Sequence, residues 1–63
     1  SLSPRKRQIL HCLLEGNTEK QAAEKVGLSH NTVHDYVKQI YQNFGVRSRS
    51  ELLARCLAGQ RRD

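Results

Sequence analysis

Apolar residues recur at helical spacing in four stretches of the chain, each bounded by a capping residue or a glycine. Ser3 and Pro4 open the first stretch, because a serine oxygen can accept from free first-turn amides and proline loses nothing at the first helical position. The apolar residues that follow share one face: Ile9, Leu10, Leu13 and Leu14. We expect a helix from about residue 4 to residue 15 that ends at Gly16.

The second stretch is short and begins at a capping box, formed by Thr18 and Gln21 three residues later. The predicted helix stops at Gly27 and buries Ala22, Ala23 and Val26. Two helical turns do not form alone in water, so this helix depends on packing against its neighbours.

The third stretch predicts the longest helix, capped by Ser29 and covering about residues 30–44. Its apolar residues form one inward stripe: Val33, Val37, Ile40, Tyr41 and Phe44. Its polar residues form an outward stripe on the opposite side: Asn31, His34, Asp35, Lys38 and Gln42. These side chains can bond to base edges, whereas a merely soluble helix more often carries pairs of Glu and Lys.

The two middle helices and the turn between them have the pattern of a helix-turn-helix. Ala23 is small where the next helix crosses it, Gly27 takes a turn conformation that a side chain resists, and Val33 fills the angle between the helices. A helix of this kind fits the major groove of DNA.

The fourth stretch follows Gly45 and Val46, which end the third helix and turn the chain back. Ser48 and Glu51 make a second capping box, and we expect the helix to end before Gly59. Its apolar residues cover more of the circumference than one core contact requires. Part of the surplus set is therefore expected to face a partner or solvent: Leu53, Cys56 and Leu57.

Composition narrows the class of partner. The 63 residues carry a formal net charge of +5, with a pI near 9.8, which favours a polyanion such as nucleic acid or an acidic membrane surface. The sequence has neither a membrane-length apolar run nor a signal-peptide pattern. Cys12 and Cys56 lack the spacing of a metal or redox motif, so we expect two reduced thiols. Because the chain begins with Ser, we expect residues 1–63 to be one domain of a longer protein.

The positive charge is unevenly placed. Within residues 18–44, three lysines are offset by three acids, so the excess lies in the flanks: Arg5, Lys6, Arg7, Arg47, Arg49, Arg55, Arg61 and Arg62. We expect phosphate anchoring to come partly from these flanks. The first three sit where a helix dipole disfavours cations, and either phosphate contact or a solvated face accounts for them.

Together these residues make the chain resemble the LuxR-type (NarL/FixJ-type) DNA-binding domain of bacterial transcription regulators. The matching segments are LSPRKRQIL at 2–10, EGNTEKQAAEKVGLS at 15–29 and NTVHDYVKQIYQNFGVRSRSELLA at 31–54. The resemblance implies an all-α, compact four-helix domain containing a helix-turn-helix, which needs no cofactor and regulates transcription by binding double-stranded DNA. It also implies an N-terminal sensor or receiver domain in the parent chain, RNA polymerase as a candidate partner, and a cytoplasmic, nucleoid-associated place in a bacterium.

The resemblance also implies roles for individual residues. The third helix would read bases through Asn31, His34, Asp35 and Lys38. Phosphate contacts would come from Lys20, Thr32, Tyr36, Gln42 and Arg47. Family members pair through the fourth helix, which implies a weak homodimer through Leu53, Cys56 and Leu57, reading half-sites about 10 bp apart.

Some positions depart from the family pattern. Lys6 stands where Glu is usual, so we expect one ion pair common to such domains to be missing. Ala22 replaces a larger Ile or Val, which predicts a lighter core. His34 and Tyr36 stand where Lys and His are common, so the base preference of relatives does not transfer.

Roles other than base reading or dimer formation remain open for some of these residues. Asp35 can pair with Lys38 or favour the helix dipole instead of accepting from cytosine. His34 can be an idle exposed imidazole, and Leu57 can belong to the chain's own core.

Other function classes also stay open. One is region 4 of a sigma factor, which lacks the GVRSRSELLA continuation, and another is a helical protein-interaction module that has lost DNA binding. His30 and His34 have a spacing able to bind a metal, and His11 adjoins Cys12, but no third ligand is near in sequence. We therefore expect neither a metal site nor an enzyme.

Overall fold

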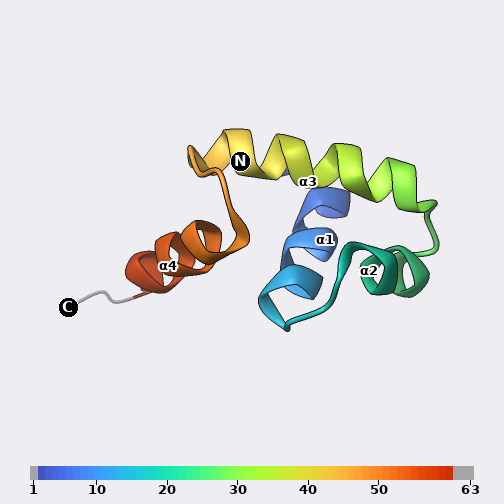
Figure 1. The fold of residues 1–63 in the computed structure, drawn as a ribbon, viewed down its shortest axis with the longest axis horizontal. Coiled ribbons are helices and arrows are strands. Elements are labelled where there is room, and N and C mark those ends of the chain that lie inside the picture. Colours follow the sequence, from blue (N-terminus) through green and yellow to red (C-terminus); the bar gives the residue numbers. More distant parts are fainter. Residues whose placement is uncertain (1, 61–63) are drawn as a thin grey trace.

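The longest helix lies along one side of the structure, and the other three helices pack against it (Figure 1). The computed structural model describes residues 2–60. That range contains no strand and forms four helices: α1 (Pro4–Leu14), α2 (Glu19–Val26), α3 (His30–Phe44) and α4 (Arg49–Gln60). The predicted all-α, four-helix architecture is confirmed.

Side-chain caps begin the first three helices where the sequence predicted them. The Oγ atoms of Ser3 and Ser29 each accept the amide N–H three positions on, at 3.3 and 3.1 Å. Thr18 Oγ1 accepts from the Gln21 amide at 3.1 Å, and Gln21 Oε1 accepts from the Thr18 amide at 2.9 Å. The first-turn amides, which have no partner within a helix, are thereby satisfied in part by local side chains.

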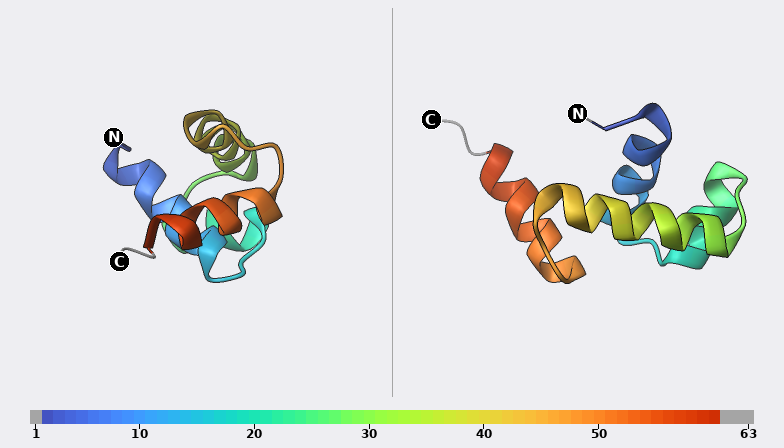
Figure 2. Two further views of the ribbon diagram at one scale, coloured as in Figure 1. Left: turned by 90° about the vertical axis from the view of Figure 1, so that its left-hand side faces the viewer. Right: turned by 90° about the horizontal axis from the view of Figure 1, so that it is seen from above.

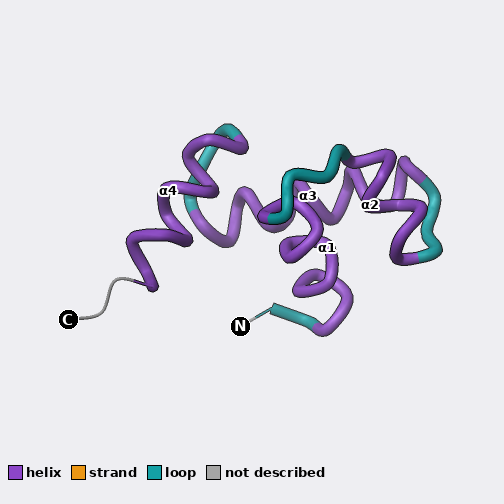
Figure 3. The backbone as a smooth tube through the Cα atoms, turned by 90° about the horizontal axis from the view of Figure 1, so that it is seen from below, coloured by secondary structure: helices purple, strands orange, loops and turns teal. Residues whose placement is uncertain are grey.

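Glycines close α2 and α3, and the connections between the helices are short (teal in Figure 3). Gly27 ends α2 with φ 74°, and Gly45 ends α3 with φ 67°, both in the left-handed region. No neighbouring atom lies within 4 Å of the position that a Cβ would take at Gly27. The requirement for glycine is therefore one of backbone conformation, worth about 1–2 kcal/mol, and not one of space.

The core forms where α1 and α2 meet the inward side of α3. Among the residues whose burial the structure describes, ten hydrophobic ones are buried: Ile9, Cys12, Leu13, Ala22, Ala23, Val33, Val37, Ile40, Val46 and Leu52. Val26, which the sequence placed in the core, is only partly buried and packs against its edge. Ala22 is fully buried, so a small side chain stands at a central position of this core.

Helix α4 lies at the opposite end of the structure from α2 (Figures 1 and 2). It joins the core chiefly through Leu52, which is fully buried, next to the buried Val46 of the preceding loop. The apolar anchor of α4 is thus small, and other interactions must hold this helix in place.

Arginine side chains supply those interactions by bonding to the carboxyl ends of other helices. Arg49 Nη2 donates to the Leu13 carbonyl of α1 at 2.6 Å, and Arg55 Nη1 donates to the Phe44 carbonyl of α3 at 2.8 Å. Arg5 of α1 donates in the same way to the Val26 carbonyl of α2, at 3.2 Å. The last carbonyls of a helix lack intrahelical partners and carry partial negative charge. A guanidinium there donates a hydrogen bond and also offsets the charge.

Three sequence-based expectations about helix ends were wrong in detail. Helix α1 ends at Leu14, with Glu15 as its cap. Helix α4 continues through Gly59, because glycine permits the left-handed conformation without requiring it. The second capping box forms only in part: the Glu51 amide donates to Ser48 Oγ at 3.2 Å, but Glu51 Oε1 accepts from the Arg47 amide instead.

The bond from Arg49 to Leu13 predicts a measurable share of the stability. We expect Arg49→Met to lower the free energy of unfolding by about 1–2 kcal/mol, because a part-buried carbonyl loses a charged donor. The melting temperature is expected to fall by about 4–8 °C for each kcal/mol. Arg47→Met is the matched control, since the exposed Arg47 bonds to Glu51 only through its backbone amide. Equal melting curves for the two variants would contradict this role of Arg49.

Candidate nucleic-acid interface

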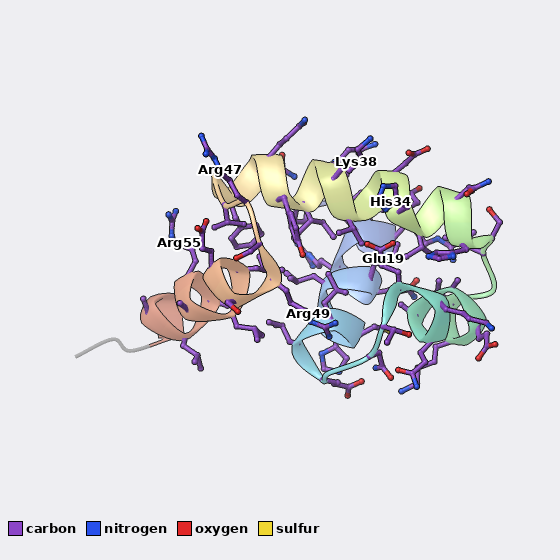
Figure 4. The ribbon with its side chains drawn as sticks, viewed as in Figure 1. Glu19, His34, Lys38, Arg47, Arg49 and Arg55 are labelled. Carbon is purple, nitrogen blue, oxygen red and sulfur yellow. The ribbon has the colours of Figure 1, made fainter. Side chains whose placement is uncertain are left out.

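Helix α3 separates its apolar and polar residues onto opposite sides. Val33 and Ile40 are 0% exposed and Val37 is 3% exposed, whereas Tyr41 and Phe44 are half-buried at the edge of the core. We call the opposite side the outward face of α3, and its five side chains are all exposed: Asn31, His34, Asp35, Lys38 and Gln42. In Figure 4, Lys38 points away from the other helices. The division that the sequence predicted is confirmed.

Asp35 and Lys38 do not form an ion pair with each other. Among the ion pairs within residues 2–60, none joins these two side chains, although their spacing would allow it. Asp35 also lies beyond the first turn of α3, which contains no acid, so the helix dipole does not account for it. The carboxylate and the ammonium are both open to an external partner.

His34 is engaged, in contrast, by a residue that sequence reasoning did not single out. Its Nδ1 lies 3.0 Å from Glu19 Oε1, at the start of α2, and His30 Nε2 lies 3.4 Å from the same oxygen. Figure 4 shows Glu19 below His34, between α2 and α3. The interpretation of His34 as an idle imidazole is therefore wrong.

The residues expected to contact phosphate differ in their exposure and in their hydrogen bonds. Lys20, Gln42 and Arg47 are exposed, whereas Tyr36 is half-buried and packs against the core. Thr32 is exposed, and its Oγ1 accepts from Ser29 Oγ–H at 2.9 Å, which leaves the Thr32 hydroxyl hydrogen to donate elsewhere. Exposed cations and neutral donors thus lie on the same two helices and the loop after them.

Several of the flanking cations serve the fold instead. The guanidinium groups of Arg5, Arg49 and Arg55 each bond to a helix carbonyl, and the expectation that phosphate anchoring comes partly from the flanks stays a prediction. The tail residues Arg61 and Arg62 lie outside the described residues. None of the ion pairs within residues 2–60 involves Lys6.

The sequence pattern of a known family matches most of this chain. The family described as "Bacterial regulatory proteins, luxR family" matches residues 1–56. The chain belongs to the luxR family. Membership of this family supports a role in DNA-binding transcription regulation, and the family is not one of enzymes.

Two of the individual relatives reported for this luxR-family chain are regulators by name. It is 40% identical over 57 residues to the "Probable HTH-type transcriptional regulator GfsR" of Streptomyces halstedii, covering 90% of this chain and 24% of that protein. It is 39% identical over 54 residues to the "Probable transcriptional regulatory protein SgaR" of Hyphomicrobium methylovorum, covering 86% and 26%. The "Spore germination protein GerE" of Bacillus subtilis is 29% identical over 56 residues, covering 89% and 76%. No solved structure matches the chain.

The luxR-family chain has an apolar groove between α1 and α4, away from the outward face of α3. The groove has a volume of about 330 Å³ and is lined by Leu14, Leu53, Cys56 and Leu57. Leu57 is 61% exposed, so its assignment to the chain's own core is wrong. Leu53 and Cys56 are half-buried, and both cysteine thiols are free, as predicted.

The remaining hypotheses concern metals and membranes. Within residues 2–60, no group of three or more His, Cys, Asp or Glu side chains is arranged to hold a metal ion. His11, one of the proposed ligands, lies 3.0 Å from Glu15 on its own helix. No helix in the same range combines the length and the hydropathy needed to cross a membrane.

Proposed function

We propose that α3 enters the major groove of double-stranded DNA and that its outward face reads base edges. The observation that supports this most directly is the division of α3, whose apolar side is buried while every polar residue of the outward face is exposed. An α-helix fits the major groove, where each base pair presents a distinct pattern of donors and acceptors.

The base contacts follow from the chemistry of four side chains. The Lys38 ammonium can donate to guanine O6 and N7, and the Asn31 amide can bond to adenine N6 and N7. Asp35 can accept from the cytosine amino group, and its charge opposes binding wherever no such donor faces it. His34 is the fourth base-reading side chain, and its Nδ1 contacts Glu19 as described above.

Phosphate contacts would come from the exposed cations Lys20 and Arg47 and from the neutral donors Thr32, Tyr36 and Gln42. Contacts of this kind fix the position of the protein on the duplex and carry no sequence information. They release bound counterions, so the affinity is expected to depend steeply on salt.

Pairing of two chains through α4 would supply the selectivity that one small module lacks. Leu53, Cys56 and Leu57 form the apolar groove with Leu14, and an exposed leucine beside such a groove is suited to burial against a second copy. A weak homodimer of this kind would place two recognition helices on half-sites about 10 bp apart.

The parent protein is proposed to be longer than this chain. The chain spans about a quarter of the length of the first two relatives, at 24% and 26%. We propose that residues 1–63 form the C-terminal DNA-binding domain of a bacterial, cytoplasmic regulator that carries an N-terminal sensor or receiver domain and acts on RNA polymerase at the nucleoid.

Selection from a random pool of double-stranded DNA tests base reading. We expect the chain to select a defined motif, and Asp35→Ala and Lys38→Ala each to lose the preference at one base pair, by about 1–3 kcal/mol of discrimination. Gln39→Ala is the control, since Gln39 is exposed on α3 but outside the outward face. A variant that binds more weakly and selects an unchanged motif would contradict its assignment. Failure to bind any DNA at low salt would favour the protein-interaction module.

The salt dependence of binding tests the phosphate contacts. We expect Arg47→Ala to weaken binding to all sequences alike and to reduce the slope of log K against log salt by about 0.9. Lys25→Ala removes the same charge from the end of α2, where Lys25 faces Glu15 at 3.9 Å, and is expected to keep the wild-type slope. The measurement is a titration at several salt concentrations. Equal slopes for wild type and Arg47→Ala would refute this contact.

Paired half-sites test the dimer. We expect Leu57→Asp to bind a single half-site as the wild type does but to lose cooperative binding to two half-sites, because a charge in the groove opposes burial. Ala58→Asp adds the same charge to an exposed neighbouring position outside the groove and is expected to remain cooperative. Undiminished cooperativity in Leu57→Asp, measured by gel shift, would rule out this surface.

A further inference from the structure

The carboxylate of Glu19, at the start of α2, contacts two histidines of α3 and so joins the two helices of the helix-turn-helix. It approaches His34 Nδ1 at 3.0 Å across 15 residues of sequence, and the same oxygen lies 3.4 Å from His30 Nε2. The side chain of Glu19 is 31% exposed, and that of His34 is 53% exposed. One side of the His34 ring is thus held by the protein, and the rest is open.

This contact determines which ring nitrogen carries the hydrogen. A carboxylate accepts hydrogen bonds and cannot donate them, so the neutral His34 ring must place its hydrogen on Nδ1. Nε2 is then left with a lone pair and acts as an acceptor. Metal-binding histidines use the same arrangement: a carboxylate that bonds to one ring nitrogen sets the tautomer and the orientation of the ring.

We propose that Glu19 is a positioning residue that sets the base preference of His34. This inference rests on the proposed base reading by α3 and adds to it a residue on α2. With Nε2 as the acceptor, His34 favours a base that presents an amino group at the position it faces, adenine through N6 or cytosine through N4, over guanine or thymine on the same strand. Without Glu19, the ring can also present an N–H, and guanine O6 or N7 and thymine O4 become acceptable partners.

Another contact between a histidine and a glutamate lies on α1, away from the proposed base-reading residues. His11 Nε2 and Glu15 Oε2 are also 3.0 Å apart, but both residues lie on α1, and the His11 side chain is 72% exposed. Glu15→Ala therefore removes one carboxylate and one imidazole contact of the same length, together with the 3.9 Å contact to Lys25 at the end of α2, and leaves α3 untouched. It controls for the change in net charge, which raises the affinity for any DNA.

The test compares the motifs selected from random DNA by four variants. His34→Ala identifies the base pair that His34 reads. We expect Glu19→Ala to lower the preference for adenine or cytosine at that base pair by about fivefold or more. Glu19→Gln is expected to keep the preference, because its amide oxygen can still accept from Nδ1–H, and Glu15→Ala is expected to select the wild-type motif.

A second measurement examines the tautomer without DNA. In mildly alkaline buffer, where imidazole is neutral, the ¹⁵N shifts of His34 are expected to show hydrogen on Nδ1 in the wild type and in Glu19→Gln, and on Nε2 in a large fraction of Glu19→Ala. A wild-type ring with its hydrogen on Nε2 would overturn the role of Glu19, whatever the DNA result.

The outcomes separate this inference from the function on which it rests. If His34→Ala relaxes one base pair while Glu19→Ala leaves that base pair unchanged, base reading stands and the role of Glu19 is refuted. If His34→Ala leaves the motif unchanged, base reading by His34 fails and the inference fails with it. A Glu15→Ala motif altered in the same way as that of Glu19→Ala would show an effect of charge alone, which also refutes the positioning role.

Discussion

Burial of one side of α3 against α1 and α2 is the interaction on which the rest of this structure depends. Val33, Val37 and Ile40 contribute the central layer of the core. The polar residues on the opposite side of α3 are exposed within the described part of the chain. Folding and recognition thus use the same helix through different residues, so the outward face can vary while the core stays constant.

The positive charge of the chain is divided between folding and DNA. Arg5, Arg49 and Arg55 each bond to the last carbonyls of another helix, where they offset the negative end of its dipole. A net charge of +5 therefore overstates the number of cations free to meet phosphate. Few exposed cations then remain to contact phosphate, so neutral donors such as Thr32 matter more for the proposed binding. The Thr32 hydroxyl accepts a hydrogen bond from Ser29.

The sequence predicted what depends on neighbours in the chain. Caps at Ser3, Thr18 and Ser29, the turn at Gly27 and the two sides of α3 all follow from spacings within about one or two helical turns. It could not predict contacts set by the packing of whole helices. The three arginine bonds span 21, 36 and 11 residues, and the contact between Glu19 and His34 spans 15. For that last contact, the only signal was an acid in the first turn of the helix that precedes the recognition helix.

The bond from Arg49 to Leu13 has a consequence for the order in which the protein is completed. The donor and the acceptor are 36 residues apart, and the acceptor belongs to the first helix. A ribosome therefore releases α1, α2 and α3 before it releases the side chain that finishes the end of α1. During synthesis α3 therefore leaves the ribosome while the Leu13 carbonyl of α1 still awaits its bond from Arg49.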